Sequence, residues 1–188
     1  KQGLEISIDE IYNPNAPSLK DAIGIFGGGC TGEVISPNGL VITNHHCGYS
    51  DVHGLSTPEH NYLEEGFWAM HSDEEVNIAG KSVYFLKRVL DVTDEVEAMK
   101  RESDVESRPL GMRKLSYLLE TKYKKETGLD AWLASMWDGS KYYMALYEVY
   151  SDVRLVAAPP VSSAAFGGDI DNWEWPQHKC DFALYRVY

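Results

Sequence analysis

The chain has 188 residues, of which 44% are hydrophobic, and its formal net charge is −12. This length and composition suffice to bury the core of one large domain or two small ones. The acidic charge excludes the basic face that nucleic-acid binding requires, and the sequence holds no apolar run long enough for a membrane span. The sequence begins with Lys1 rather than Met, which predicts a processed or recombinant start with any signal peptide already removed.

The first part of the chain predicts a lead-in followed by a β-hairpin. The lead-in, residues 1–26, is expected to end with a short helix and a strand. Residues 27–47 then predict two short strands joined by a turn at Ser36-Pro37-Asn38-Gly39. This turn is favourable because proline presets φ and Asn-Gly tolerates a positive φ.

The expected hairpin brings Cys30 and Cys47 to one end and places His45 and His46 at the lip of a sheet. A disulfide between the two cysteines would stabilise the fold by about 3 kcal/mol and would imply an oxidising compartment. Two buried, reduced thiols are the alternative. The three cysteines match no spaced zinc-binding pattern.

The middle of the chain changes from strand patterns to helix patterns and back. From Thr93 the apolar spacing becomes helical, Asp94 and Glu97 resemble a capping box, and Gly128 is a suitable helix end. The expected elements are a loop with a short helix at 61–70, a strand at 83–92, two helices within 93–140, and strands at 142–150 and 153–158.

The helices are interpreted as an insertion in a β domain. Trp132 and Trp137, which follow the second helix, are expected to be core aromatic residues without a functional role. The sequence therefore predicts a mainly β fold over residues 1–188. Its hairpin and strands lie within 23–92 and 142–188, with a helical insertion at about 93–140.

The last stretch, residues 166–180, has two glycines near its start and is rich in acidic, amide and indole side chains, so it is expected to be a loop. A strand is expected to follow from Asp181. Loops of this kind form sites. A zinc site there would draw its ligands from His45, His46, Cys47, His178 and Asp181. Because adjacent strand residues point to opposite faces, the two consecutive histidines are poorly placed to share one ion. We expect no metal and no other cofactor.

Nucleophilic catalysis requires a histidine base, an acid that orients it, and a serine or cysteine nucleophile. The residues alone leave the acid open among Asp152, Asp169, Asp171 and Asp181. Elsewhere in the chain, the remaining histidines are expected to be ordinary core or surface residues: His53, His60 and His71.

A hairpin that ends in His-Cys and starts near a second cysteine resembles the histidine platform of chymotrypsin-fold peptidases. In those proteins a disulfide ties the same two places, which here are Cys30 and Cys47. The resemblance gives the catalytic role to His46 and a supporting role to His45.

Four segments in order resemble the bacterial dipeptidyl-peptidase 7 and 11 family, over roughly residues 23–188. The segments are Phe-Gly-Gly-Gly-Cys-Thr-Gly-Glu at 26–33, Asn-His-His-Cys-Gly-Tyr at 44–49, Asp-Val-Arg-Leu-Val at 152–156 followed by Ala-Pro-Pro at 158–160, and Phe-Gly-Gly-Asp at 166–169 with Asp-Asn-Trp at 171–173.

This resemblance implies part of a chymotrypsin-like double β-barrel, with the first barrel present and incomplete. It implies a serine dipeptidyl aminopeptidase that releases dipeptides from peptides with a free N-terminus. His46 would be the general base and Asp181 the acid, while Asn172 and Trp173 would help to hold the substrate's α-amino group. It also implies export to the periplasm or cell surface of a bacterium, and a homodimer for the full-length protein.

The sequence departs from the family pattern near the proposed acid, where Gln177, Lys179 and Cys180 replace the usual arginine and Thr-Gly. No Gly-x-Ser-Gly motif occurs in the 188 residues. We therefore expect an N-terminal fragment whose nucleophilic serine lies outside this chain, and which is inactive alone. Two alternatives stay open, a non-catalytic peptide-binding module with a degenerate peptidase fold and a zinc hydrolase.

Overall fold

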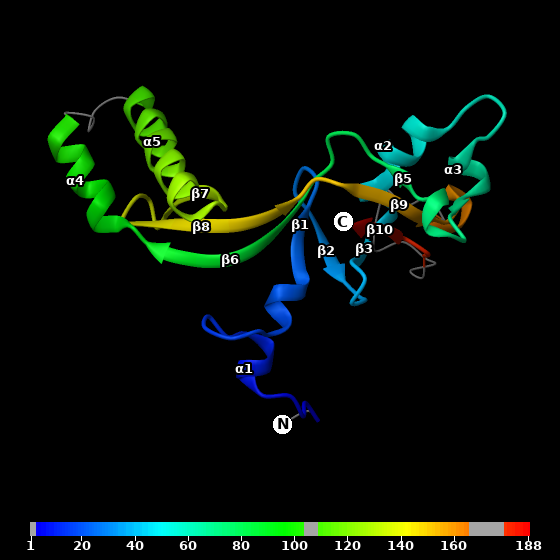
Figure 1. The fold of residues 1–188 in the computed structure, drawn as a ribbon, viewed down its shortest axis with the longest axis horizontal. Helices are drawn as coiled ribbons and strands as arrows, with labels where there is room; N and C mark the ends of the chain where they lie inside the picture. Colours follow the sequence, from blue (N-terminus) through cyan, green and yellow to red (C-terminus); the bar gives the residue numbers. More distant parts are fainter. Residues whose placement is uncertain (1–2, 104–108, 166–178) are drawn as a thin grey trace. The chain divides into compact units, whose positions relative to one another are not determined.

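The computed structural model describes residues 3–103, 109–165 and 179–188. The chain forms two compact units (Figure 1). The hairpin unit comprises Ala22–Val83 and Tyr150–Tyr188, and the helical unit comprises Lys1–Asp21 and Tyr84–Val149. Each unit is described separately below.

The hairpin unit is built mainly from strands. Its strands are β1 (Ile23–Phe26), β2 (Cys30–Val34), β3 (Leu40–Thr43), β4 (Phe67–Trp68), β5 (Val76–Asn77), β9 (Val153–Ala158) and β10 (Ala183–Val187). Its helices are α2 (His45–Leu55), α3 (Tyr62–Glu65), α6 (Val161–Ala164) and the short 3₁₀ helix η2 (Ser72–Glu74).

The strands of the hairpin unit pair in the order β4-β9-β10-β3-β2-β1, and β5 also pairs with β9. β10 is antiparallel to β3, with Ala183 opposite Thr43. In an antiparallel pair, the residues before one strand lie beside the residues after the other. The segment that precedes β10 therefore lies beside the segment that follows β3, which joins two distant parts of the sequence.

The expected hairpin is confirmed as β2 and β3, which pair around the turn at 36–39. The Ser36 hydroxyl accepts hydrogen bonds from the backbone N–H groups of Asn38 and Leu40, at 3.3 and 3.2 Å. Gly39 has a φ of 70°, a conformation that glycine adopts without strain.

The expectation that His45 and His46 end a strand is wrong. β3 ends at Thr43, Asn44 is the extended N-cap residue, and the His-His-Cys sequence forms the first turn of α2. The apolar alternation stops at Thr43, so nothing keeps the following polar residues in the sheet. The consequence is geometric, because successive helical residues are about 100° apart rather than on opposite faces.

The core of the hairpin unit contains fully buried side chains from four strands. Phe26, Val41, Leu155 and Tyr185 are at most 1% exposed. The Phe26 and Tyr185 rings lie 4.6 Å apart between centroids. This packing holds β1 and β10 together in the core of the hairpin unit. A packed core of this kind provides the rigid support that a site requires.

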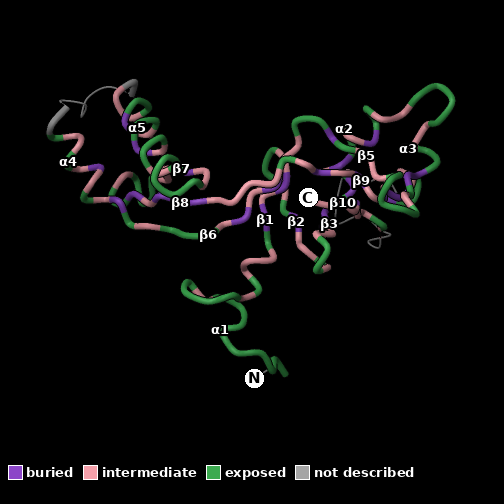
Figure 2. The backbone as a smooth tube through the Cα atoms, in the orientation of Figure 1, coloured by how far each residue is buried: buried purple, intermediate pink, exposed green. Residues whose placement is uncertain are grey.

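The helical unit combines a sheet of order β6-β8-β7 with two long helices. Its elements are α1 (Ile8–Ile11), the 3₁₀ helix η1 (Leu19–Ala22), β6 (Val83–Asp91), α4 (Thr93–Ser103), α5 (Pro109–Thr127), β7 (Asp130–Met136) and β8 (Lys141–Tyr150). Along the first part of β8, buried residues alternate with partly buried or exposed ones (Figure 2), the pattern of a strand with one face toward a core.

Both helices expected from the apolar spacing are present, and Val96, Leu115 and Leu119 pack with Met144 and Leu146 of β8 in one buried cluster. α4 begins differently from the expectation. Asp91, rather than Asp94, accepts hydrogen bonds from the backbone and the hydroxyl of Thr93, at 3.0 and 2.5 Å. Gly128 has a φ of 72° and follows the end of α5, as expected.

The expected helical insertion at about 93–140 is not helical throughout, because Asp130–Met136 forms β7, which pairs with β8. Trp132 and Trp137 are 39% and 70% exposed, so they are not core residues. Trp132 lies on Tyr147 at 4.5 Å between ring centroids, and this cross-strand aromatic pair stabilises a partly solvated sheet face.

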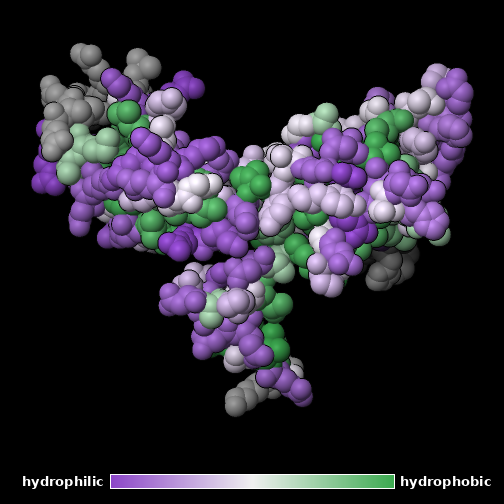
Figure 3. Space-filling view, viewed as in Figure 1, coloured by the Kyte–Doolittle hydropathy of each residue, from purple (hydrophilic) through white to green (hydrophobic). Residues whose placement is uncertain are grey.

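Over α5 of the helical unit, the face drawn in Figure 3 is mainly hydrophilic, and its hydrophobic areas are smaller. None of the helices in the described ranges has both the length and the apolar character needed to cross a bilayer.

Candidate active site

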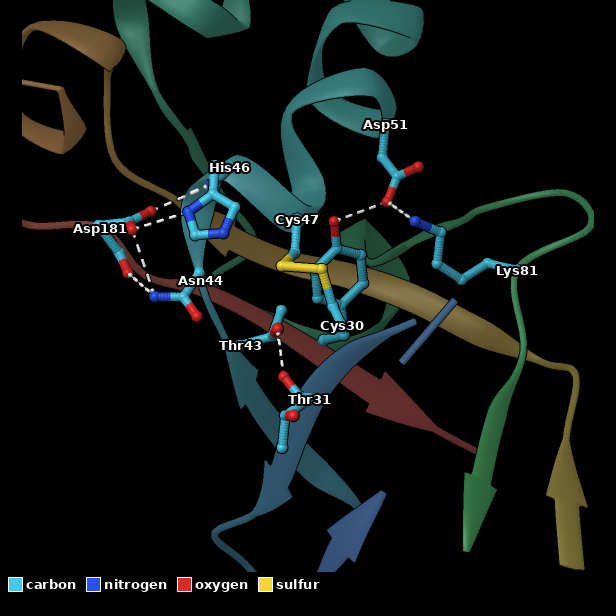
Figure 4. Close-up of a disulfide and its surroundings, with 10 residues drawn as sticks. Cys30, Thr31, Thr43, Asn44, His46, Cys47, Asp51, Lys81 and Asp181 are labelled. Carbon is cyan, nitrogen blue, oxygen red and sulfur yellow. Dashed lines mark hydrogen bonds and ion pairs between the residues drawn. A yellow bond between two sulfur atoms is a disulfide. The ribbon is translucent and has the colours of Figure 1, made fainter. Parts of the chain in front are cut away.

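The structure brings His46 and Asp181 into direct contact (Figure 4). His46 is the second residue of α2, and Asp181 lies just before β10. The His46 Nδ1 atom is 2.8 Å from Asp181 Oδ2, and the His46 backbone N–H donates to Asp181 Oδ1 at 3.1 Å. One carboxylate therefore holds both the backbone and the ring of the same histidine.

The Asn44 side chain also donates hydrogen bonds to Asp181. Its side-chain amide donates to Asp181 Oδ2 at 3.2 Å and to the Asp181 backbone oxygen at 3.3 Å. Burial raises the pKa of Asp181, but the hydrogen bonds from His46 and Asn44 outweigh burial and lower it below its ordinary value. Asp181 is therefore ionised at neutral pH.

An ionised carboxylate only accepts hydrogen bonds, so its contact with His46 places the imidazole proton on Nδ1. The lone pair of the neutral ring is then on Nε2. The His46 side chain is 66% exposed, so this side of the ring is open to a reacting group. The arrangement can take a proton from a nucleophile at Nε2 while Asp181 stabilises the resulting imidazolium.

His45 has the opposite environment, with only 3% of the residue exposed. Burial lowers the pKa of His45, as does the neighbouring His46, whereas the Asp181 charge and a hydrogen bond to the Pro159 backbone raise it. The net direction is downward, so the buried ring is neutral at neutral pH. Its Nε2 atom has no hydrogen-bond partner in the described part of the chain.

A disulfide joins Cys30, the first residue of β2, to Cys47, the third residue of α2, with their Cα atoms 6.2 Å apart. The bridge therefore attaches the first turn of α2 to the hairpin, next to His46 (Figure 4). The sequence leaves open a disulfide or two reduced thiols, and the structure contains the disulfide. Cys180, the residue before Asp181, is free and exposed.

The other candidate acids and amine-binding residues have different positions. Asp152 is paired with Arg154 at 2.7 Å and with the Asn77 side chain at 2.8 Å, so its carboxylate is engaged away from His46. Several candidates lie outside the described residues: Asp169, Asp171, Asn172, Trp173, Gln177 and His178.

The remaining histidines are not part of the His46–Asp181 contact. His53 and His60 stack on neighbouring tyrosines at 6.5 and 6.0 Å between ring centroids. Within residues 3–103, 109–165 and 179–188, no three His, Cys, Asp or Glu side chains gather as a metal site would require.

Sequence reasoning missed two groups of the site. The sequence motif contains Asn44 but does not indicate its role, and nothing in the motif indicates the hydrogen bond from the His46 backbone N–H. An asparagine at the junction of a strand and a helix was the available signal, because such residues commonly satisfy polar groups at helix starts. Here its amide is directed at Asp181 instead.

Comparison with known proteins identifies close relatives. The chain is 47% identical over 193 residues to dipeptidyl-peptidase 7 of Phocaeicola vulgatus and 46% identical over 198 residues to the Asp/Glu-specific dipeptidyl-peptidase of Porphyromonas gingivalis. Both alignments cover 100% of this chain and 27% of the relative. The chain thus spans about a quarter of the length of these relatives.

The fold also matches solved structures. The crystal structure of Porphyromonas endodontalis DPP11 in complex with the dipeptide Arg-Glu aligns with a TM-score of 0.86 and 40% identity, over 99% of this chain and 28% of that chain. The expected family and the mainly antiparallel β fold with several helices are confirmed. Because residues 1–188 match the description Peptidase S46 throughout, the chain belongs to the peptidase S46 family.

Proposed function

We propose that the protein containing this chain is a serine dipeptidyl aminopeptidase in which His46 is the general base and Asp181 orients it. The observation that carries this proposal is the 2.8 Å contact between His46 Nδ1 and Asp181, with the His46 ring otherwise exposed. The names of the relatives support the same reaction class.

In the proposed mechanism, His46 Nε2 removes the proton of a serine hydroxyl as the serine oxygen attacks the peptide carbonyl. Asp181 stabilises the imidazolium, which then donates its proton to the leaving amine. The serine is proposed to come from a part of the protein beyond these 188 residues, because the chain contains no Gly-x-Ser-Gly motif and spans 27% of its relatives.

The substrate class is peptides with a free N-terminus. We assign to Asn172 and Trp173 the role of holding the α-amino group, by their resemblance to the family motif. A bound ammonium group at a fixed distance from the nucleophile would restrict cleavage to the second peptide bond, because the site would then count two residues from the end.

We also propose that the protein is exported to the periplasm or cell surface and that the full-length protein is a homodimer. The Cys30–Cys47 disulfide supports export, since such bonds persist in oxidising compartments. Alkylation of intact cells followed by mass analysis tests this directly. Two alkylated thiols at these positions would contradict an oxidising location.

The decisive experiment compares His46→Ala with His53→Ala in the full-length protein, using a fluorogenic dipeptide substrate. Both residues lie on α2, but His53 is stacked on Tyr49 rather than bound to an acid. We expect His46→Ala to lower kcat by about 10³-fold or more and His53→Ala to stay within about twofold. A His46→Ala protein with wild-type turnover would refute the mechanism. Peptide binding without turnover in the wild type would favour the non-catalytic module.

A further inference from the structure

A second contact joins the two elements that carry His46 and Asp181. Tyr185 of β10 is fully buried, and its hydroxyl donates to the Asp51 carboxylate of α2 at 2.8 Å. The Lys81 ammonium lies 2.6 Å from the same carboxylate oxygen (Figure 4). The Lys81 and Asp51 side chains are only 15% and 9% exposed, so this is a largely buried network of three polar groups.

The packing around the Tyr185 hydroxyl leaves no room for a shift toward the helix. A Cβ atom at Gly48 of α2 would lie 2.4 Å from this hydroxyl, so the glycine permits the close approach. On its other side the Tyr185 ring packs on Phe26, and the Lys81 ammonium lies 4.9 Å from the centre of the Phe26 ring. The distance between α2 and β10 is therefore fixed at this point.

The network combines an ion pair with a hydrogen bond from the Tyr185 hydroxyl. Burial and the adjacent Asp51 carboxylate raise the pKa of Tyr185, so its hydroxyl remains a donor. The Asp51 charge is balanced by Lys81. Replacing a buried ion pair by well-packed apolar residues is commonly neutral or stabilising, which favours a positional role over a stabilising one for these polar groups.

The geometry relates this network to the active-site pair. Asp51 follows His46 by five residues on α2, and Tyr185 follows Asp181 by four residues along the other segment. Five helical residues extend roughly 7 Å, so the two contacts are separated along the helix axis. The His46–Asp181 contact and the Cys30–Cys47 disulfide both hold the first turn of α2, and by themselves they would allow the helix to pivot about that turn. The Tyr185–Asp51 contact, which lies further along α2, opposes that rotation.

We propose that Tyr185, Asp51 and Lys81 are positioning residues that fix α2 on β10 and so hold the His46 ring against Asp181 in the catalytic orientation. This proposal rests on the proposed function of His46. Because a displacement of about 1 Å can cost a catalytic group on the order of 100-fold in rate, a small rotation of α2 is sufficient to impair proton transfer.

The test compares Tyr185→Phe with Tyr123→Phe in the full-length protein. Tyr123 is a matched control because its hydroxyl donates to Glu95 at 2.9 Å and Lys122 binds the same carboxylate at 2.6 Å, in the helical unit. We expect Tyr185→Phe to lower kcat by about tenfold with KM within about twofold, and Tyr123→Phe to change neither. Lys81→Met should behave like Tyr185→Phe, whereas Lys81→Arg should restore most of kcat because it keeps the charge.

A readout independent of turnover is the NMR resonance of the His46 Nδ1 proton, which we expect the hydrogen bond to Asp181 to deshield. We expect this resonance to broaden or disappear in Tyr185→Phe and to persist in Tyr123→Phe. Wild-type kcat and an unchanged resonance in Tyr185→Phe would overturn the positioning role. So would a kcat loss that merely follows the unfolded fraction measured by circular dichroism. By contrast, full activity of His46→Ala would overturn the proposed function itself. In that case the resonance measured in Tyr185→Phe, which keeps His46, would still test the positioning role.

Discussion

His45 and His46 are consecutive in the sequence, yet His45 is buried against the core while the His46 ring is exposed and bound to Asp181. The first turn of α2 produces this difference, since neighbouring helical residues are about 100° apart. The buried ring is held neutral, and the exposed ring carries the proton transfer that we propose. The two histidines are therefore expected to respond differently to substitution.

Because His45 is buried, we predict that the folded protein becomes less stable in acid. Its pKa is lowered in the folded state, mainly by burial, so between that value and the ordinary 6.5 the unfolded state binds more protons. The free energy of unfolding should therefore fall as pH drops below about 6.5. Urea denaturation of the full-length protein at several pH values measures this slope. His45→Asn should flatten the slope. Equal slopes in wild type and His45→Asn would exclude this origin.

Asp181→Asn is predicted to abolish most activity without unfolding the protein. An asparagine amide can donate to Nδ1 and so favours the tautomer whose proton is on Nε2, where the base must accept one. We expect kcat to fall by about 10⁴-fold, the effect of the equivalent change in a serine protease triad. Asp152→Asn is the matched control, since Asp152 is paired with Arg154 and does not touch His46. Comparable losses in both variants would contradict the assignment.

Most of the strand and helix pattern could be predicted from the sequence because each element shows a local signal. The β2–β3 hairpin follows from its Pro-Asn-Gly turn, and α5 follows from apolar residues at helical spacing that end at Gly128. β7 was missed because helical and strand periods are hard to distinguish over seven residues. Its Trp132 packs on Tyr147 on the sheet face, whereas hydrophobicity alone favours a core position.

The pairing of His46 with Asp181 could not be predicted from local signals. Asp181 reaches His46 only because β10 pairs with β3 in a register that sets Ala183 opposite Thr43. That pairing joins segments more than a hundred residues apart, and no local pattern encodes it. Only the family resemblance selected Asp181 over Asp152. The role of Asn44 could not be predicted for the same reason, because its partner Asp181 is brought close only by the pairing of β3 with β10.

The Cys30–Cys47 disulfide is predicted to stabilise the fold substantially. The two cysteines are 17 residues apart, and closing a loop of this size contributes about 3 kcal/mol by restricting the unfolded chain. The double variant Cys30→Ala/Cys47→Ala should lower the free energy of unfolding by about this amount, measured by urea denaturation. Cys180→Ala is the control, because that thiol is free. Equal stability of the double variant and the control would show that the bridge contributes little.

Gly39 is predicted to be required by the hairpin turn. Its φ is 70°, and a Cβ atom there would lie 2.4 Å from the Val187 backbone oxygen. Gly39→Ala should therefore destabilise the protein by more than about 1 kcal/mol. Gly54→Ala is the matched control, because no heavy atom lies within 4 Å of its Cβ position in α2, and alanine there should stabilise by about 0.5–1 kcal/mol.

The same substitution should also lower activity, because the turn sets where β3 begins beside β10. Gly39 accepts a hydrogen bond from the Val187 backbone N–H at 3.0 Å, and the β3–β10 pairing ends where Asp181 meets Asn44. We expect kcat of the Gly39→Ala protein to fall at a temperature where it remains folded, as monitored by circular dichroism. Unchanged kcat under those conditions would mean that the His46–Asp181 contact tolerates displacement of this end of the sheet.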